Sequence, residues 1–162
     1  MGIAALLLGS NEGDRVTYLD KAKEFIEIQA GSIIKKSSLW ETAAWGITDQ
    51  PNFINQALLV ETILEPHLLL EKLLGIEELL GRKRIEKWGP RIIDIDILYY
   101  DNIIINENDL KIPHPFLPER RFTLIPLNEI SPVWVHPILH KTVGKLLEEC
   151  EDEGEVSVYK RE

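Results

Sequence analysis

The chain has 162 residues, of which 44% are hydrophobic and 28% are charged, and its formal net charge is −9. This composition excludes a disordered chain, and no apolar run approaches the roughly 20 residues of a membrane span. The acidic balance argues against a nucleic-acid partner. We therefore expect one soluble domain over residues 1–162 with no membrane partner, in the cytoplasm because the start lacks a basic signal segment, and with a mobile acidic tail from about residue 151.

The first part of the chain alternates between strand and helix patterns. Residues 3–8 form an unbroken apolar run, which is typical of a strand buried on both faces. Asp14 is a candidate N-cap for a helix that ends at Gly31. Residues 32–40 are rich in β-branched and aromatic side chains and predict a strand near an edge, and residues 41–51 predict a long covering loop.

The pattern continues with a strand over residues 52–62, in which Phe53 and Asn55 share one face. The other face carries apolar side chains, namely Ile54, Leu58 and Val60. Pro66 begins a second helix that ends at Gly81, and a further strand follows around Asp94. A turn at 101–102 predicts a hairpin with residues 103–105, and beyond it we expect loops and a helix from about 142 to 150.

This order predicts an α+β fold of the ferredoxin-like βαββαβ kind, with an antiparallel sheet, both helices on one face, and extra C-terminal elements. If the apolar faces of the strands meet the helices, Phe53, Asn55, Asp94 and Asp96 all point to the face without helices. The unusual polar residues therefore gather on one open surface.

Asp94 and Asp96 project from the same face of their strand, about 7 Å apart. Such a pair repels unless a cation lies between its members, and oxygen ligands of this kind suit Mg²⁺. A solvated polar strand is the alternative, and Asp-x-Asp alone leaves both open. A cationic segment lies just upstream, and in an acidic protein it favours a small polyanion as ligand. Its members are Arg82, Lys83, Arg84, Lys87 and Arg91.

Six short motifs occur in one order along the chain, and together they closely resemble 6-hydroxymethyl-7,8-dihydropterin pyrophosphokinase, a family of folate biosynthesis. The motifs are Leu8-Gly9-Ser10-Asn11, the run from Asp49 to Asn55, Gly81-Arg82-x-Arg84, Lys87-Trp88-Gly89-Pro90-Arg91, Asp94-Ile95-Asp96 and Ile112-Pro113-His114-Pro115. The resemblance extends to about Pro132. Two positions depart from the family pattern: Leu74 replaces a glutamine, and Pro115 replaces an aromatic residue.

The resemblance implies transfer of the diphosphoryl group of ATP to the hydroxymethyl oxygen of the dihydropterin, with release of AMP. ATP would be the co-substrate and two Mg²⁺ ions the cofactors, held by Asp94 and Asp96. The catalytic residues implied are Arg82, Arg91, Asp94 and Asp96. The residues implied to bind ATP are Glu77, Arg82, Arg84, Arg91, Ile97, His114 and Arg120. The residues implied to bind the pterin are Thr42, Ala44, Phe53, Asn55, Trp88 and Phe122. The segment from Arg82 to Trp88 resembles a loop that closes over ATP, and we expect a monomer.

Two other functions remain open from the residues. One is a different two-metal enzyme on a similar sheet, such as a nucleotidyl transferase, because strand carboxylates that bind Mg²⁺ also serve that chemistry. The other is a non-catalytic binding module, because the fold alone does not specify a function. The arginines could also form surface ion pairs of little energetic consequence. The products formed from ATP distinguish the two enzymes.

Overall fold

The computed structural model describes residues 1–43, 51–81 and 92–160, and the structural statements below concern these residues. The helices are α1 (Arg15–Gln29), α2 (Pro66–Leu79), α3 (Arg121–Ile130) and α4 (Val143–Glu149), with a 3-10 turn η1 (Leu117–Glu119). The strands are β1 (Gly2–Ser10), β2 (Ser32–Lys36), β3 (Trp40–Thr42), β4 (Phe53–Thr62), β5 (Asp94–Tyr100), β6 (Ile105–Asn106), β7 (Lys111–Ile112) and β8 (Val156–Val158). Each described helix is too short or too polar to cross a membrane.

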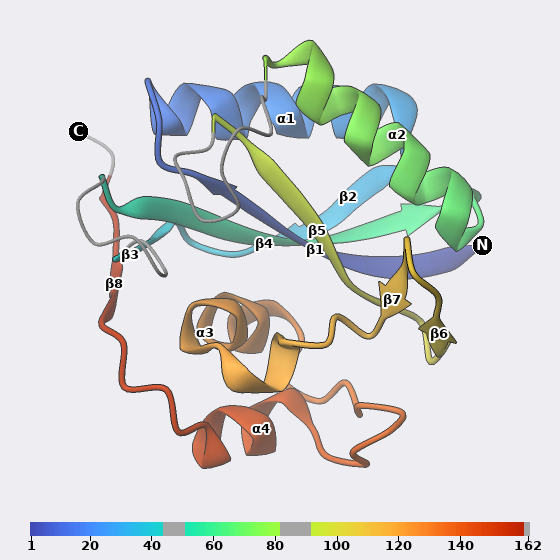
Figure 1. Ribbon diagram of the computed structural model, residues 1–162, viewed down its shortest axis with the longest axis vertical. Coiled ribbons are helices and arrows are strands. Elements are labelled where there is room, and N and C mark those ends of the chain that lie inside the picture. Colours follow the sequence, from blue (N-terminus) through green and yellow to red (C-terminus); the bar gives the residue numbers. More distant parts are fainter. Residues whose placement is uncertain (44–50, 82–91, 161–162) are drawn as a thin grey trace.

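An antiparallel sheet in the order β5-β1-β4-β3-β8 lies at the centre of the fold, and β2 also pairs with β4. Helices α1 and α2 cover one face of this sheet (Figure 1). With β2 and β3 together in the place of the second strand, this is the predicted ferredoxin-like arrangement. Asp14 caps α1 by accepting the Thr17 N–H, and Pro66 begins α2, as the sequence predicts.

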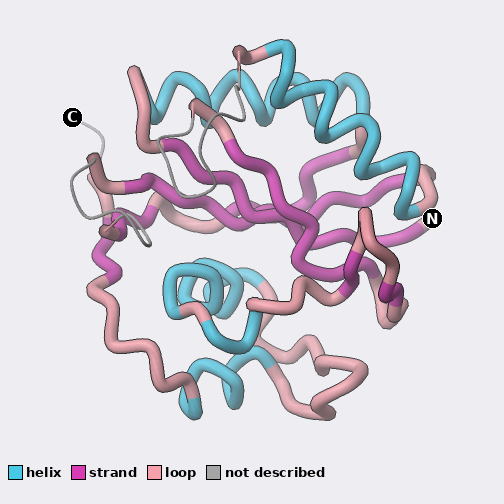
Figure 2. Tube along the Cα trace, in the orientation of Figure 1, coloured by secondary structure: helices cyan, strands magenta, loops and turns pink. Residues whose placement is uncertain are grey.

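The opposite face of the sheet was expected to be free of helices, and this expectation was wrong in part. Helices α3 and α4 lie below that face in Figure 2, so the sheet is a middle layer between two layers of helix. The reason is that β1 is apolar on both sides, and buried side chains on the second side need a cover. The second core includes Ala5, Leu7, Ala57, Leu59, Leu98, Leu124 and Leu127.

Three local predictions also differ from the structure. The strand expected over residues 32–40 is divided into β2 and β3 at Ser37, whose side-chain oxygen accepts the Ala57 N–H at 2.9 Å. The run expected to pair back as a hairpin pairs forward instead, β6 with β7. The acidic tail contains an unpredicted strand, β8, which pairs with β3. The predicted helix near the C-terminus is present as α4, with Thr142 as its N-cap.

Candidate active site

The register of the sheet places one predicted metal ligand and one predicted pterin ligand in the same row. Gly9 of β1 lies opposite Asp94 of β5 on one side and opposite Asn55 of β4 on the other. Residues in register across a sheet point to the same face, so Asp94 and Asn55 share the face expected from the sequence. Neighbouring strands are about 4.8 Å apart, so the two residues are separated by about 10 Å across Gly9.

Gly9 is the residue that makes room for the Asn55 side chain in this row. A Cβ atom at its position would lie 2.7 Å from Asn55 Oδ1 and 3.5 Å from Phe53 Cδ1. The first distance is shorter than a carbon–oxygen contact allows, so only glycine accommodates the Asn55 side chain as it stands. The motif Leu8-Gly9-Ser10-Asn11 therefore contributes to the shape of the site through the absence of a side chain.

Asn55 is fixed in orientation although it is a polar group in a buried position. It is 3% exposed, and its Nδ2 donates a hydrogen bond of 3.2 Å to Thr42 Oγ1 in β3. Thr42 is itself buried and lies opposite the half-buried Phe53 in the sheet. An amide held in this way presents a defined pattern of donor and acceptor to a ligand. Thr42, Phe53 and Asn55, three of the predicted pterin ligands, are thus neighbours.

Asp94 and Asp96 are half-buried at the start of β5, while Ile93, Ile95 and Ile97 enter the core below α1 and α2. Glu77 of α2 is almost completely buried, and its Oε2 accepts the N–H of Ile95 at 2.7 Å. The residue bonded in this way is the one between the two aspartates. Glu77 therefore fixes the strand that carries Asp94 and Asp96. The resemblance predicted Glu77 as a neighbour of the nucleotide.

The N-terminus of α3 brings a cation and an aromatic ring to the same face. Arg120 precedes α3, and its guanidinium carbon lies 4.5 Å from the ring centre of Phe116 and 5.5 Å from that of Phe122. Burial lowers the pKa of Arg120, but the negative charges of Asp96 and Asp94 oppose this shift, so the guanidinium and the aspartates share one electrostatic environment. Phe116, which contacts both Arg120 and His114, was missed by the sequence reasoning.

His114 lies between β7 and η1, and its imidazole is held in a neutral form. Burial, together with the positive charge of Arg120, lowers the pKa of His114 to about 4, with Asp94 opposing the shift. Its Nδ1 accepts the N–H of Phe116 at 3.2 Å, so in the neutral ring the proton is on Nε2. His114 is consequently a hydrogen-bond donor at neutral pH without being a cation.

Six predicted residues remain. One of them is Ile97, whose side chain is buried in the core on the opposite face and does not join the site. The Ile95 N–H of the same strand is directed to Glu77 of α2. The other five lie outside the described residues, namely Ala44, Arg82, Arg84, Trp88 and Arg91.

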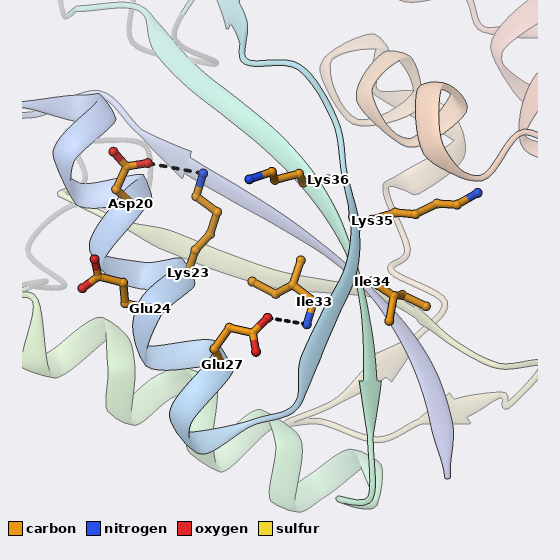
Figure 3. A pocket seen from close by; sticks show the side chains of 8 residues that line it. All are labelled: Asp20, Lys23, Glu24, Glu27, Ile33, Ile34, Lys35 and Lys36. Carbon is orange, nitrogen blue, oxygen red and sulfur yellow. Dashed lines mark hydrogen bonds and ion pairs between the residues drawn. The ribbon is translucent and has the colours of Figure 1, made fainter.

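A shallow surface groove between α1 and β2 is separate from this row of residues (Figure 3). Three of its charged side chains have partners within the protein. Lys23 lies 3.3 Å from Asp20, and Glu27 Oε1 accepts the N–H of Ile33 at 2.8 Å. We assign no part of the reaction to this groove.

Taken together, the site has two carboxylates on an edge strand, a nearby guanidinium, and a buried amide with an aromatic neighbour about 10 Å away. These features suit an enzyme that brings a polyphosphate to a flat, polar-edged ring. Residues 5–132 match the family described as 7,8-dihydro-6-hydroxymethylpterin-pyrophosphokinase (HPPK). The chain belongs to this family, as the sequence motifs predicted.

Curated relatives agree with this assignment. The chain is 46% identical over 145 residues to the 2-amino-4-hydroxy-6-hydroxymethyldihydropteridine pyrophosphokinase of Aquifex aeolicus, covering 87% of this chain and 88% of the relative. It is 43% identical over 152 residues to the enzyme of the same name from Methylorubrum extorquens, covering 93% and 95%. The chain is accordingly an ATP-dependent pyrophosphokinase of folate biosynthesis that uses the hydroxymethyldihydropterin substrate.

Solved structures support the fold. A structure described as HPPK-DHPS in complex with substrates superposes with a TM-score of 0.75 at 19% identity, over 91% of this chain. The wild-type Plasmodium falciparum HPPK-DHPS superposes with a TM-score of 0.74 at 21% identity. The chain spans 43% of the first of these proteins and 44% of the second.

Proposed function

We propose that the site between Asp94 and Asn55 is where the diphosphoryl group of ATP is transferred to the hydroxymethyl oxygen of the dihydropterin, with release of AMP. The observation that supports this proposal is the row Asp94–Gly9–Asn55. In this row Asp94, the proposed ligand of the phosphate-bound metal, and Asn55, the proposed ligand of the pterin ring, lie on one face at a fixed separation. A separation of about 10 Å matches a bicyclic ring with its hydroxymethyl arm pointing toward the carboxylates.

In this proposal the pterin ring lies between Phe53 and Phe122 and is read at its polar edge by Asn55. Flat heterocycles stack well on aromatic rings, and the fixed amide of Asn55 offers one donor and one acceptor. The hydrogen bond between Asn55 and Thr42 sets which edge of the amide faces the ligand. Ala44 and Trp88 complete the predicted pterin set and lie outside the described residues.

On the ATP side, Arg120 and the Nε2–H of His114 would donate to phosphate oxygens. Phosphoryl transfer depends mainly on an in-line geometry and on neutralising phosphate charge, which guanidinium and imidazole donors serve without a covalent step. Ile97 would contact the nucleotide through its backbone, because its side chain is buried in the core. Arg82, Arg84 and Arg91 are the further predicted phosphate ligands, and Glu77 remains a predicted neighbour of the nucleotide.

Two Mg²⁺ ions are proposed as cofactors, with Asp94 and Asp96 as their protein ligands. The residues fit this cation: both are half-exposed carboxylates on one face of one strand, and oxygen atoms are the donors that Mg²⁺ takes. Bound Mg²⁺ would neutralise the charge of the triphosphate. Two further proposals concern the whole protein. We propose that it is a monomer, which analytical sedimentation would test. We also propose that it is located in the cytoplasm, where ATP is available.

The decisive experiment measures the nucleotide released from ATP with the dihydropterin present and absent. We expect AMP and the pterin diphosphate, formed only when both substrates are present. Release of free pyrophosphate would favour a nucleotidyl transferase, release of ADP would indicate an ordinary kinase, and no turnover would favour a binding module.

The metal assignment is tested by calorimetry with a non-hydrolysable ATP analogue, titrated with and without Mg²⁺. Asp94→Ala and Asp96→Ala should lose most of the Mg²⁺-dependent affinity, whereas Glu71→Ala, an exposed acid on α2, should keep it. Full retention of Mg²⁺-dependent binding in both aspartate variants would overturn the assignment.

A further inference from the structure

The acidic tail contributes one carboxylate whose two oxygens both accept backbone hydrogen bonds. Asp152 is half-buried, and its Oδ2 accepts the N–H of Arg121 at 3.0 Å while its Oδ1 accepts the N–H of Gly154 at 2.9 Å. The first bond joins the tail to the first residue of α3, 31 positions earlier in the chain. Asp152 therefore connects a segment beyond the family match, which ends at residue 132, to the helix that borders the site.

Helix α3 needs this contact because it has no cap of its own. The residue before the helix is Arg120, and an arginine side chain has only donors, so it cannot accept an N–H of the first turn. The first N–H groups of a helix have no partner within the helix, and a carboxylate there also interacts favourably with the helix dipole. Asp152 supplies the acceptor that the local sequence lacks.

The start of α3 carries two of the proposed ligands. Arg120 and Phe122 flank Arg121, whose N–H is the group that Asp152 holds. The negative charges that oppose the burial-induced lowering of the Arg120 pKa include Asp152 as well as Asp94 and Asp96. The tail carboxylate thus acts on the position of the backbone and on the charge around the guanidinium.

Strand β8 holds the tail in place. Val156 and Val158 pair with Thr42 and Trp40 of β3, and the N–H of Tyr159 donates to the Leu39 carbonyl at 2.8 Å. The guanidinium carbon of Arg15 lies 5.6 Å from the Tyr159 ring centre. Figure 1 shows the tail passing from α4 alongside α3 to the edge of the sheet. Asp152 is therefore anchored on both sides, by α4 before it and by β8 after it.

We propose that Asp152 is a positioning residue for the reaction: it fixes the start of α3 so that Phe122 meets the pterin and Arg120 meets the phosphates. This inference rests on the proposed pterin and ATP ligands. It extends the functional part of the chain into the acidic tail, to which neither the sequence motifs nor the family match reaches.

The test compares Asp152→Ala with Glu153→Ala, a neighbouring exposed acid that matches it in charge change. In steady-state assays of AMP release, Asp152→Ala should raise KM for both the pterin and ATP by about tenfold, the effect of one lost hydrogen bond to an ordered group. The value of kcat at saturation should stay within about threefold, because Asp152 touches neither substrate. Glu153→Ala should leave all three values unchanged. KM values within twofold of the unmodified enzyme would overturn the proposal, whatever happens to thermal stability.

Two further variants separate a positioning role from general destabilisation. Asp152→Asn keeps one acceptor oxygen and should give intermediate KM values. Removal of residues 156–162 deletes β8 but leaves Asp152, and because it releases the same contact, its effect should be less than additive with Asp152→Ala. Simple additivity of the two changes would contradict the proposal.

Phe122→Ala, measured in the same assay, distinguishes failure of the positioning role from failure of the proposed pterin site. If Phe122→Ala raises the pterin KM and Asp152→Ala does not, the positioning role alone is wrong. If Phe122→Ala has no effect on the pterin KM, the assignment of the pterin site is wrong and the inference fails with it.

Discussion

At the scale of single residues, the site depends on side chains that are fixed by atoms outside the ligand surface. Asn55 is oriented by Thr42, His114 by the backbone of Phe116, and the backbone between Asp94 and Asp96 by Glu77. Each of these contacts is made within the protein itself, so the entropy cost of ordering the group falls on folding rather than on ligand binding.

Gly9 gives the sharpest prediction at this scale. Gly9→Ala places a methyl group against Asn55 Oδ1, which must move away from its bond with Thr42. We expect the pterin KM to rise by about tenfold, roughly 1.4 kcal/mol and comparable with the loss of one hydrogen bond. The change is measured by steady-state kinetics with the pterin varied at saturating ATP.

Gly75→Ala is the matched control for this change, because a Cβ at Gly75 in α2 meets nothing within 4 Å. It should leave the pterin KM unchanged and raise stability by about 0.5–1 kcal/mol, the usual gain for alanine over glycine inside a helix. Equal pterin KM values for the two alanine variants would show that Gly9 has no part in the shape of the site.

At the scale of elements, an acidic cluster joins the start of α2 to the loop between β6 and β7. The Nε2 of His67 lies 2.8 Å from Glu107 Oε2, and its Nδ1 lies 3.6 Å from Glu65 Oε2. Desolvation lowers the pKa of His67, but the negative charges of Glu107, Glu65 and Asp109 outweigh it and raise the pKa above 6.5. When it is protonated, the imidazole therefore pairs with carboxylates from both elements.

This contact predicts a pH dependence of stability with a definite sign. A raised pKa in the folded state means that the contribution of His67 is complete below pH 6.5 and is lost as the pH rises through the folded pKa. The pKa of Glu65 is lowered by the backbone N–H groups of His67 and Leu68, so Glu65 stays ionised at pH 5.5. The difference in melting temperature between the unmodified protein and His67→Gln should be larger at pH 5.5 than at pH 8.5.

Glu107→Gln provides the control, because it removes the carboxylate nearest to His67. In the Glu107→Gln background, the effect of His67→Gln on the melting temperature should depend less on pH. Differential scanning calorimetry at the two pH values measures both variants. A difference between the unmodified protein and His67→Gln that is constant with pH would contradict the interpretation of this cluster.

The elements also show which parts of the fold the sequence could predict. The alternation in residues 53–60 and 93–97 identified the two faces of β4 and β5, because strand periodicity depends only on which side chains are buried. The motifs then identified the family. The partner of β6 and the presence of β8 were missed, because pairing between short strands depends on contacts with distant residues that leave no local pattern.

Among the predicted site residues, Asp94 and Asn55 were assigned by strand spacing to the same face of the sheet, and their register across Gly9 agrees, whereas the side chain of Ile97 on β5 enters the opposite core. Phe116 and Asp152 were missed for a different reason. Phe116 stands one position after the departure at Pro115, and Asp152 lies within a run of acids that resembles a solvated tail. Only the three-dimensional fold distinguishes one engaged carboxylate from its neighbours.

At the scale of the whole molecule, the central sheet is shared by two cores. Leu58 is buried beneath α1 and α2, while Leu124 of α3 is buried in the second core on the other face. Trp134 reports on the second core, since its ring stacks on Tyr99 with centres 4.0 Å apart. Because β1, β4 and β5 contribute side chains to both cores, neither core can come apart without exposing the sheet that supports the other.

The last prediction follows from this shared sheet and tests the expected single domain. Leu58→Ala and Leu124→Ala should each lower the free energy of unfolding by about 2–5 kcal/mol, the usual cost of such a cavity. In urea, the transition followed by tryptophan fluorescence should coincide with that followed by far-ultraviolet circular dichroism in both variants, because the cores unfold together. Leu124→Ala could instead shift the fluorescence transition to lower urea while the circular dichroism transition stays unchanged. That result would show that residues 121–150 form a separate unit. The continuity of the sheet through both cores argues for one transition, since loss of the second core would leave the apolar side chains of β1 exposed to water.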